Sequence, residues 1–162
     1  VKGPSCGGRR GDGSRGQCKG EIMPGFKTVL FATDFSENAG KAFAEAVDIA
    51  KFRDAKLFIL NVVPAGDELV SPGAQAPAWL PDEDAILAKL EETYVAAGVQ
   101  TEAAVRYGAQ AHKIVDYAEE VGADLIVIGA RGMGWVVGFF GGGSIADKVV
   151  KNAKVPVLVV PA

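Results

Sequence analysis

An acidic residue follows the first strongly apolar segment of the chain. Asp34 lies in the sequence Thr33-Asp34-Phe35-Ser36, directly after the apolar run 29–32. A carboxylate at this position accepts hydrogen bonds, which suits a ribose hydroxyl or an adenine amino group. The alternative is structural, because an aspartate at a helix entry can help Ser36 to cap that helix. The residues alone leave both interpretations open.

A glycine-rich segment follows the most hydrophobic run of the sequence. Seven of the 15 residues from Gly129 to Gly143 are glycine, and Ser144 comes next. Glycines allow positive φ angles and let backbone N–H groups approach a ligand. A helix N-terminus directly after such a segment favours an anion. The pattern therefore predicts either a phosphate site with Ser144 as a donor or a flexible linker ended by a serine cap.

Alternating strands and helices must position these two segments. Five short runs have the character of strands: 29–32, 57–63, 101–107, 125–128 and 157–160. Helical patterns separate them, from Ser36 onward and over 82–97, 109–121 and 144–152. Strands joined by single helices run parallel. We expect one doubly wound α/β domain, whose ligand lies beyond the carboxyl ends of the strands at the point where strand order switches.

The first 22 residues differ from the rest in composition. Residues 1–22 carry a net charge of +3 and both cysteines, whereas residues 23–162 carry −6. We expect 1–22 to be a disordered extension or a remnant of expression cloning, with Met23 as the natural start and 23–162 as the folded domain. Because 23–162 holds no cysteine, thiol chemistry and cysteine-ligated metals are excluded there.

Composition and charge limit the classes of partner that the protein could bind. The chain has 162 residues, is 49% hydrophobic and 23% charged, and its net charge is −3. This is enough apolar content for one buried core. The sequence contains no run of 18 uncharged apolar residues, so we expect no membrane span. The net charge gives no reason to expect nucleic-acid binding. We therefore expect a cytoplasmic protein without a membrane or nucleic-acid partner.

Four segments in this order resemble the universal stress protein family. They are Thr33-Asp34-Phe35-Ser36, residues 123–129, the glycine-rich segment, and residues 153–160. The resemblance spans Phe26 to Val160. It implies a single five-stranded parallel sheet of order 3-2-1-4-5 with helices on both faces. It also leaves 157–160 at a sheet edge, where antiparallel pairing between the Val157–Val160 strands of two copies would form a homodimer.

The ATP-binding branch of that family has Gly, two residues, Gly, nine residues, then Gly followed by Ser or Thr. Gly129 and Gly132 match the first step, but ten residues separate Gly132 from Gly143-Ser144. Ala146 also stands where many ATP-binding members carry a second hydroxyl residue. By position, the resemblance implies that ATP, with Mg²⁺ as a candidate companion, contacts these residues: Asp34 and Val62 around adenine and ribose, and Gly129, Gly132, Gly143, Ser144 and Ile145 along the phosphates.

Side chains outside this set offer little further chemistry. Arg131 could pair with a phosphate, although a solvated arginine is an equal alternative. His112, the only histidine, points away from the apolar face of its predicted helix and is expected at the surface. A transition-metal site or a Ser-His triad is therefore poorly supported. The apolar residues Trp135, Val136, Val137, Phe139 and Phe140 either fold onto the sheet or form a surface for a second subunit or an unnamed protein client.

Three functions follow from these observations. The first is an ATP-binding, dimeric regulatory module of the stress response, with at most slow ATP hydrolysis because no strong base is evident. The second is an interaction protein of the same fold without nucleotide binding, which the extra residue after Gly132 and Ala146 favour. The third is an enzyme that activates a substrate with ATP, but Thr33-Asp34-Phe35-Ser36 and a single histidine match neither signature of such enzymes.

Overall fold

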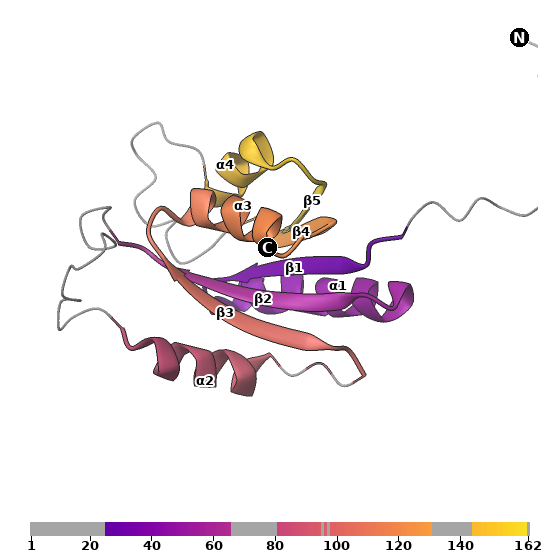
Figure 1. The fold of residues 1–162 in the computed structure, drawn as a ribbon, viewed down its shortest axis with the longest axis horizontal. Coiled ribbons are helices and arrows are strands. Elements are labelled where there is room, and N and C mark those ends of the chain that lie inside the picture. The colour runs from indigo at the N-terminus through magenta and orange to yellow at the C-terminus, as the bar shows by residue number, and fades with distance from the viewer. Residues whose placement is uncertain (1–24, 66–80, 95, 97, 131–143, 162) are drawn as a thin grey trace, which may run out of the picture.

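The computed structural model describes residues 25–65, 81–94, 96, 98–130 and 144–161. Strands and helices alternate in chain order: β1 Thr28–Thr33, α1 Glu37–Arg53, β2 Lys56–Val63, α2 Glu83–Thr93, β3 Thr101–Tyr107, α3 Gln110–Glu120, β4 Leu125–Gly129, α4 Ile145–Asn152 and β5 Val157–Val160. The strands form one parallel sheet of order β3-β2-β1-β4-β5 (Figure 1). This confirms the predicted sheet and its order.

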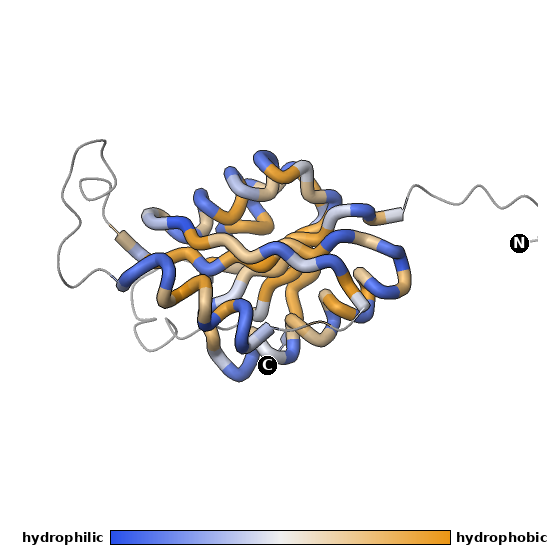
Figure 2. Tube along the Cα trace, turned by 60° about the horizontal axis from the view of Figure 1, so that its bottom comes forward, coloured by the Kyte–Doolittle hydropathy of each residue, from blue (hydrophilic) through white to orange (hydrophobic). Residues whose placement is uncertain are grey.

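Helices cover both faces of this sheet. Alternate side chains of a strand point to opposite faces, so β1 contributes to two separate apolar clusters. Val29 and Phe31 pack with α1 and α2, whereas Leu30 and Ala32 pack with α3 and α4. Figure 2 shows the resulting arrangement, with hydrophobic strands inside and hydrophilic residues on the outer sides of the helices. The fold is thus a three-layer α/β domain.

Burial differs between central and edge strands. The five residues from Val29 to Thr33 are all buried, as are residues 125–128 of β4. All four residues of β5, at one edge, are only half-buried, and β3 at the other edge begins with two exposed residues. Within the described ranges, no helix has the length and apolar character that would let it cross a membrane.

The end of α2 differs from the prediction. The helix expected over 82–97 ends at Thr93, and Tyr94 follows with φ −114° and ψ 63°, outside the helical region. Its ring turns into the apolar cluster between the sheet and α1. The apolar spacing of Tyr94 fitted a helix stripe, but burial of the aromatic ring overrides the helical pattern at this residue.

Candidate functional site

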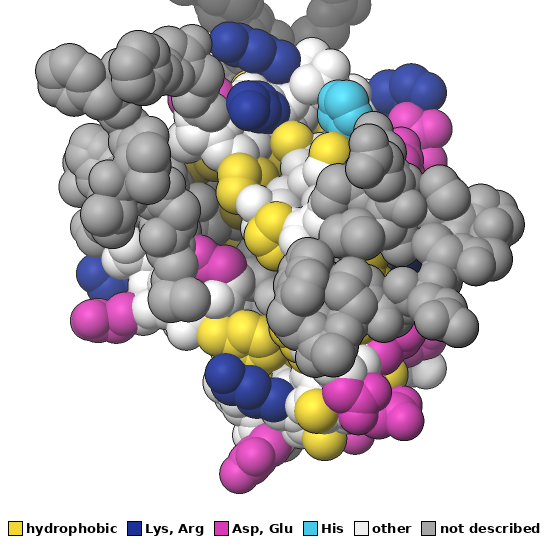
Figure 3. Space-filling view, turned by 90° about the vertical axis from the view of Figure 1, so that its left-hand side faces the viewer, with side chains coloured by type: hydrophobic (Ala, Val, Ile, Leu, Met, Phe, Trp, Pro, Cys, Tyr) yellow, Lys and Arg dark blue, Asp and Glu magenta, His cyan; other side chains and the backbone are white. Residues whose placement is uncertain are grey.

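The ends of β1 and β4 lie side by side at the carboxyl edge of the sheet. The register pairs Ala32 of β1 with Ile128 of β4, and Thr33 on the other side with Asn61 of β2. The chain leaves β1 toward β2 in one direction and reaches β4 in the other, which makes this edge the switch point of the sheet. Figure 3 looks onto the edge and shows apolar side chains at its centre with an acidic side chain beside them.

Asp34 forms part of the turn between β1 and α1. Its Oδ1 accepts a hydrogen bond from the backbone N–H of Ser36 at 3.0 Å, and Ser36 Oγ accepts one from the N–H of Ala39 at 3.2 Å. The structural interpretation of Asp34 is therefore correct. A carboxylate has about four acceptor positions, so this bond is compatible with a ligand hydroxyl as a further donor.

A buried polar network that the sequence did not predict lies beneath this turn. The hydroxyls of Thr33 and Tyr94 are 2.6 Å apart, and Asn61 Nδ2 donates to the Thr33 carbonyl at 2.8 Å. Thr33 is 7% and Asn61 8% exposed. Buried polar groups are costly unless they are hydrogen-bonded, and these three satisfy one another. The polar Asn61 inside the apolar run 57–63 was the one sequence signal for this network.

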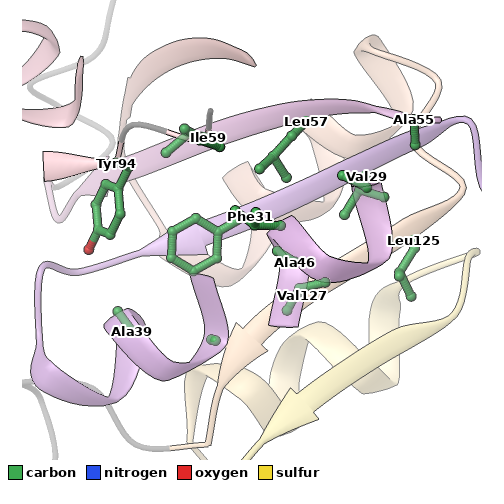
Figure 4. Close-up of a cluster of buried hydrophobic side chains, with 14 of the residues drawn as sticks. Val29, Phe31, Ala39, Ala46, Ala55, Leu57, Ile59, Tyr94, Leu125 and Val127 are labelled. Atoms are coloured by element: carbon green, nitrogen blue, oxygen red, sulfur yellow. The ribbon is translucent and has the colours of Figure 1, made fainter. Parts of the chain in front are cut away.

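An aromatic cluster packs around Tyr94. Its ring centroid lies 5.3 Å from that of Phe31, 4.9 Å from Phe43 and 6.0 Å from Phe35, on which it stacks. Figure 4 shows Tyr94 next to Phe31 at one end of the apolar cluster, with its hydroxyl pointing away from Ile59. Lys89 Nζ lies 4.3 Å from the centre of the Phe35 ring, a cation–π distance. The β1–α1 turn is thereby tied to α2.

The surroundings of Tyr94 raise the pKa of its phenol. Burial raises the pKa of the Tyr94 hydroxyl above its ordinary value, the hydrogen bond to Thr33 lowers it in part, and the negative charge of Asp34 raises it further. Like an ordinary tyrosine, Tyr94 is neutral at physiological pH, so the contact with Thr33 is a hydrogen bond between two neutral groups.

Val62 approaches the edge through its backbone. Its side chain is 5% exposed and packs into the cluster on the α3 side of the sheet. Its carbonyl oxygen accepts a hydrogen bond from Gln110 Nε2 at 3.3 Å. The predicted ligand contact at Val62 is therefore limited to main-chain atoms, and Gln110 is a neighbouring side chain that the sequence analysis missed.

Gly129 allows α1 to approach the end of β4 closely. A Cβ atom at this position would lie 3.4 Å from the carbonyl oxygen of Asn38, in the first turn of α1. That distance is at the tight end of van der Waals contact, so a side chain here would press directly on the backbone of α1. The predicted need for glycine at this position thus has a packing reason besides any ligand.

The start of α4 forms a complete capping box. Ser144 Oγ accepts a hydrogen bond from the N–H of Asp147 at 3.1 Å, and the Asp147 carboxylate accepts one from the N–H of Ser144 at 3.0 Å. Ile145 follows, half-buried against the α3–α4 cluster. A phosphate at this terminus would meet the negative charge of Asp147 and compete for the Ser144 N–H. The spacing Ser-x-x-Asp in the sequence carried this signal.

The remaining predicted site residues lie outside the described residues. These are Arg131, Gly132 and Gly143, together with the apolar residues of 135–140. His112 is exposed on α3, which confirms the surface position expected for it. In the part of the chain that the structure describes, no group of three or more His, Cys, Asp or Glu side chains could hold a metal ion.

The fold defines a class of protein: a parallel α/β domain whose strand order β3-β2-β1-β4-β5 places the switch point between β1 and β4. The chain belongs to the universal stress protein family, whose model matches residues 25–161. It is 37% identical over 146 residues to universal stress protein Sll1654 of Synechocystis sp., covering 88% of each chain. It is 33% identical over 150 residues to universal stress protein YxiE of Bacillus subtilis, covering 83% of this chain and 99% of that one.

Two similar solved structures contain adenine nucleotides. The first is a universal stress protein in complex with cAMP, with a TM-score of 0.62 and 31% identity over 84% of this chain and 97% of the other. The second is the universal stress protein from Archaeoglobus fulgidus in complex with dAMP, with a TM-score of 0.58 and 25% identity over 85% and 99% of the two chains.

Proposed function

We propose that this protein binds an adenine nucleotide, ATP with Mg²⁺, at the carboxyl ends of β1 and β4 and acts as a dimeric regulatory module of the stress response. One observation carries the proposal: β1 and β4 are neighbours in the sheet, so Asp34 and Gly129 come together at the switch point. The cAMP and dAMP complexes of two similar proteins support an adenine nucleotide as the ligand.

Each part of the nucleotide has a matching group in this proposal. The Asp34 carboxylate accepts hydrogen bonds from ribose hydroxyls, and the Val62 carbonyl accepts one from the adenine amino group. Gly129 and the first turn of α4, at Ser144 and Ile145, face the phosphates together with Gly132, Gly143 and Arg131. Mg²⁺ would be held chiefly by phosphate oxygens. We expect any ATP hydrolysis to be slow. General-base catalysis needs a base within reach of the attacking water, and no strong base is evident from the sequence.

A specific observation favours a second candidate, an interaction protein of the same fold without nucleotide. The Asp147 carboxylate occupies the Ser144 N–H and places a negative charge at the start of α4. Phosphates bind well at helix N-termini because those N–H groups are available. The two candidates therefore differ in a measurable quantity, the affinity of the protein for phosphorylated adenosine.

Mass spectrometry of small molecules released from denatured, freshly purified protein tests the proposal. It is followed by calorimetric titration of nucleotide-free protein with ATP, with and without Mg²⁺. We expect an adenine nucleotide in the released fraction and saturable binding of ATP. Absence of both released nucleotide and binding heat at millimolar ATP would contradict the proposal and favour the interaction protein.

The proposed homodimer forms through β5. The N–H of Ile126 donates to the Pro156 carbonyl and that of Ala130 to the Val160 carbonyl, so the even-numbered residues of this strand bond to β4. In a parallel pair, the alternate residues Val157 and Val159 then direct their N–H and C=O groups to the outer edge. An apolar edge of this kind is satisfied by antiparallel pairing with a second copy.

A proline at the outer edge of β5 tests this dimer. Val159→Pro removes one outward N–H without removing a bond to β4, so we expect a shift from dimer to monomer in analytical ultracentrifugation. Ala103→Pro is the matched control, because it makes the same change at an outward position of β3, the opposite edge strand. A monomeric wild-type protein, or a folded Val159→Pro variant that dimerises as wild type does, would contradict this interface.

A further inference from the structure

The residues on either side of Asp34 are held by a tyrosine from a distant part of the chain. Thr33 Oγ1 lies 2.6 Å from the Tyr94 hydroxyl and also accepts a hydrogen bond from the N–H of Phe35 at 3.0 Å. From β2, Asn61 Nδ2 donates a hydrogen bond of 2.8 Å to the Thr33 carbonyl. Thr33 is therefore held through its side chain and its main chain, and its bond to Tyr94 links the residue that follows α2 to the turn that contains Asp34.

Phe35 adopts a backbone conformation that needs support from its surroundings. Its φ angle is +62°, in the left-handed region that a bulky residue rarely occupies. The Tyr94 ring stacks on the Phe35 ring at 6.0 Å, and Lys89 Nζ lies 4.3 Å from the centre of the Phe35 ring. Such strained residues persist where the neighbouring structure fixes them, and they concentrate at functional sites.

The hydroxyl of Tyr94 serves neither the helix cap nor the apolar packing. The cap of α1 uses the bonds from the Ser36 N–H to Asp34 and from the Ala39 N–H to Ser36, and neither bond involves the Tyr94 hydroxyl. A phenylalanine at position 94 would supply the same ring to the cluster without a buried polar atom to satisfy. What the hydroxyl adds is one bond to Thr33, the residue that also accepts the N–H of strained Phe35. The residues directly before and after Asp34, Thr33 and Phe35, are therefore both held by contacts with Tyr94.

We propose that Tyr94 is a positioning residue for the adenine nucleotide: its hydrogen bond to Thr33 and its stacking on Phe35 hold the β1–α1 turn so that Asp34 presents its carboxylate to the ribose. This inference rests on the proposed nucleotide binding and deepens it, because it assigns part of the affinity to the residue that directly follows α2. The Tyr94 phenol is neutral at physiological pH, as an ordinary tyrosine is, and can therefore serve as a donor to Thr33.

The first test removes the hydroxyl and leaves the ring. We expect Tyr94→Phe to weaken AMP binding about fivefold in calorimetry, the size of one hydrogen bond. Tyr117→Phe is the matched control, because it removes the hydroxyl of a buried tyrosine packed on the other face of the sheet; we expect unchanged affinity. At the other end of the bond, we expect Thr33→Val to lose affinity to a similar extent and Thr33→Ser, which keeps the hydroxyl, to retain it.

The second test separates positioning from a structural role. If Tyr94 acts through Asp34, the change Tyr94→Phe has no further effect on AMP affinity in an Asp34→Ala background. An equal effect in both backgrounds, or unchanged affinity in folded Tyr94→Phe, would overturn the inference while leaving nucleotide binding intact. Wild-type protein that binds neither AMP nor ATP would instead reject the proposed function and this inference with it. Should Tyr94→Phe fail to fold, the Thr33→Val and Thr33→Ser pair decides by the same criteria.

Discussion

The helices α1 and α4 both begin with a serine cap, and their surroundings differ. Ser36 caps α1 shortly after β1, and Ser144 caps α4 after the segment that follows β4. At α1, the N–H of Ser36 bonds to Asp34, which precedes the helix, and the turn is held through Thr33 by Tyr94, the residue that follows α2. At α4, the N–H of Ser144 bonds to Asp147 in the helix's own first turn. The start of α1 thus depends on tertiary contacts, whereas the cap of α4 is completed locally.

This difference indicates which part of a nucleotide each terminus suits. At the β1–α1 turn, a carboxylate lies beside buried, hydrogen-bonded groups, and it is an acceptor for hydroxyl groups. At α4, a carboxylate lies where a phosphate would have to bind. In the proposed complex, we therefore expect the adenosine moiety to supply most of the affinity and the terminal phosphates to add little.

The largest expected effect separates the stability of the two regions. Phe31 is fully buried beneath the β1–α1 turn and contacts Phe43 and Tyr94. We expect Phe31→Ala to lower the free energy of unfolding by about 3–5 kcal/mol. Ile145→Ala, at the half-buried start of α4, should cost about 1–2 kcal/mol. Urea denaturation of both variants measures the difference. Equal losses would show that the two helix starts are held equally.

A smaller effect concerns the adenosine end. Asp34→Ala should weaken AMP binding at least about tenfold, equivalent to about 1.4 kcal/mol, because a charged acceptor for the ribose is lost. It should also lower stability, since the Ser36 N–H loses its partner. Asp34→Asn is the control: it keeps an acceptor oxygen for Ser36 and should restore stability without restoring the affinity. Calorimetry and urea denaturation give the two numbers, and unchanged AMP affinity in folded Asp34→Ala would be incompatible with the proposed site.

The smallest expected effect concerns the phosphate end. Asp147→Asn removes the negative charge at the start of α4, and we expect ATP affinity to rise about two- to fivefold, while stability falls by about 0.3–1 kcal/mol through the weaker interaction with the helix dipole. Asp116→Asn, an exposed position on α3, controls for net charge. ATP affinity that is unchanged, or lowered, in Asp147→Asn would mean that the phosphates do not reach this helix.

The fold could be predicted from the sequence because its signals are local and repeated. Apolar runs separated by helical patterns indicated five parallel strands, and the resemblance of 123–129 and 153–160 to a known family implied their order. Ser36 and Ser144 cap helices as their residue type predicts. The extension expected over 1–22 lies outside the described residues and stays a prediction.

The candidate site was predicted less completely, for a physical reason. The bond between Thr33 and Tyr94 joins residues 61 positions apart, and no local pattern reports such a distance. Tyr94 fitted the apolar stripe of a helix, and only tertiary packing reveals that the helix ends before it. The left-handed conformation of Phe35 was likewise hidden, because propensity favours glycine or asparagine at positive φ.

The central claim is that an adenine nucleotide binds where β1 and β4 end. A titration of isotope-labelled protein with ATP and Mg²⁺, followed by the backbone amide resonances, tests this claim most directly. We predict that the largest shifts fall on Phe35, Ser36 and Gly129, with small shifts at the amino ends of the strands, such as Lys56 and Thr101. No shifts at millimolar ATP, or the largest shifts at those amino ends, would contradict it.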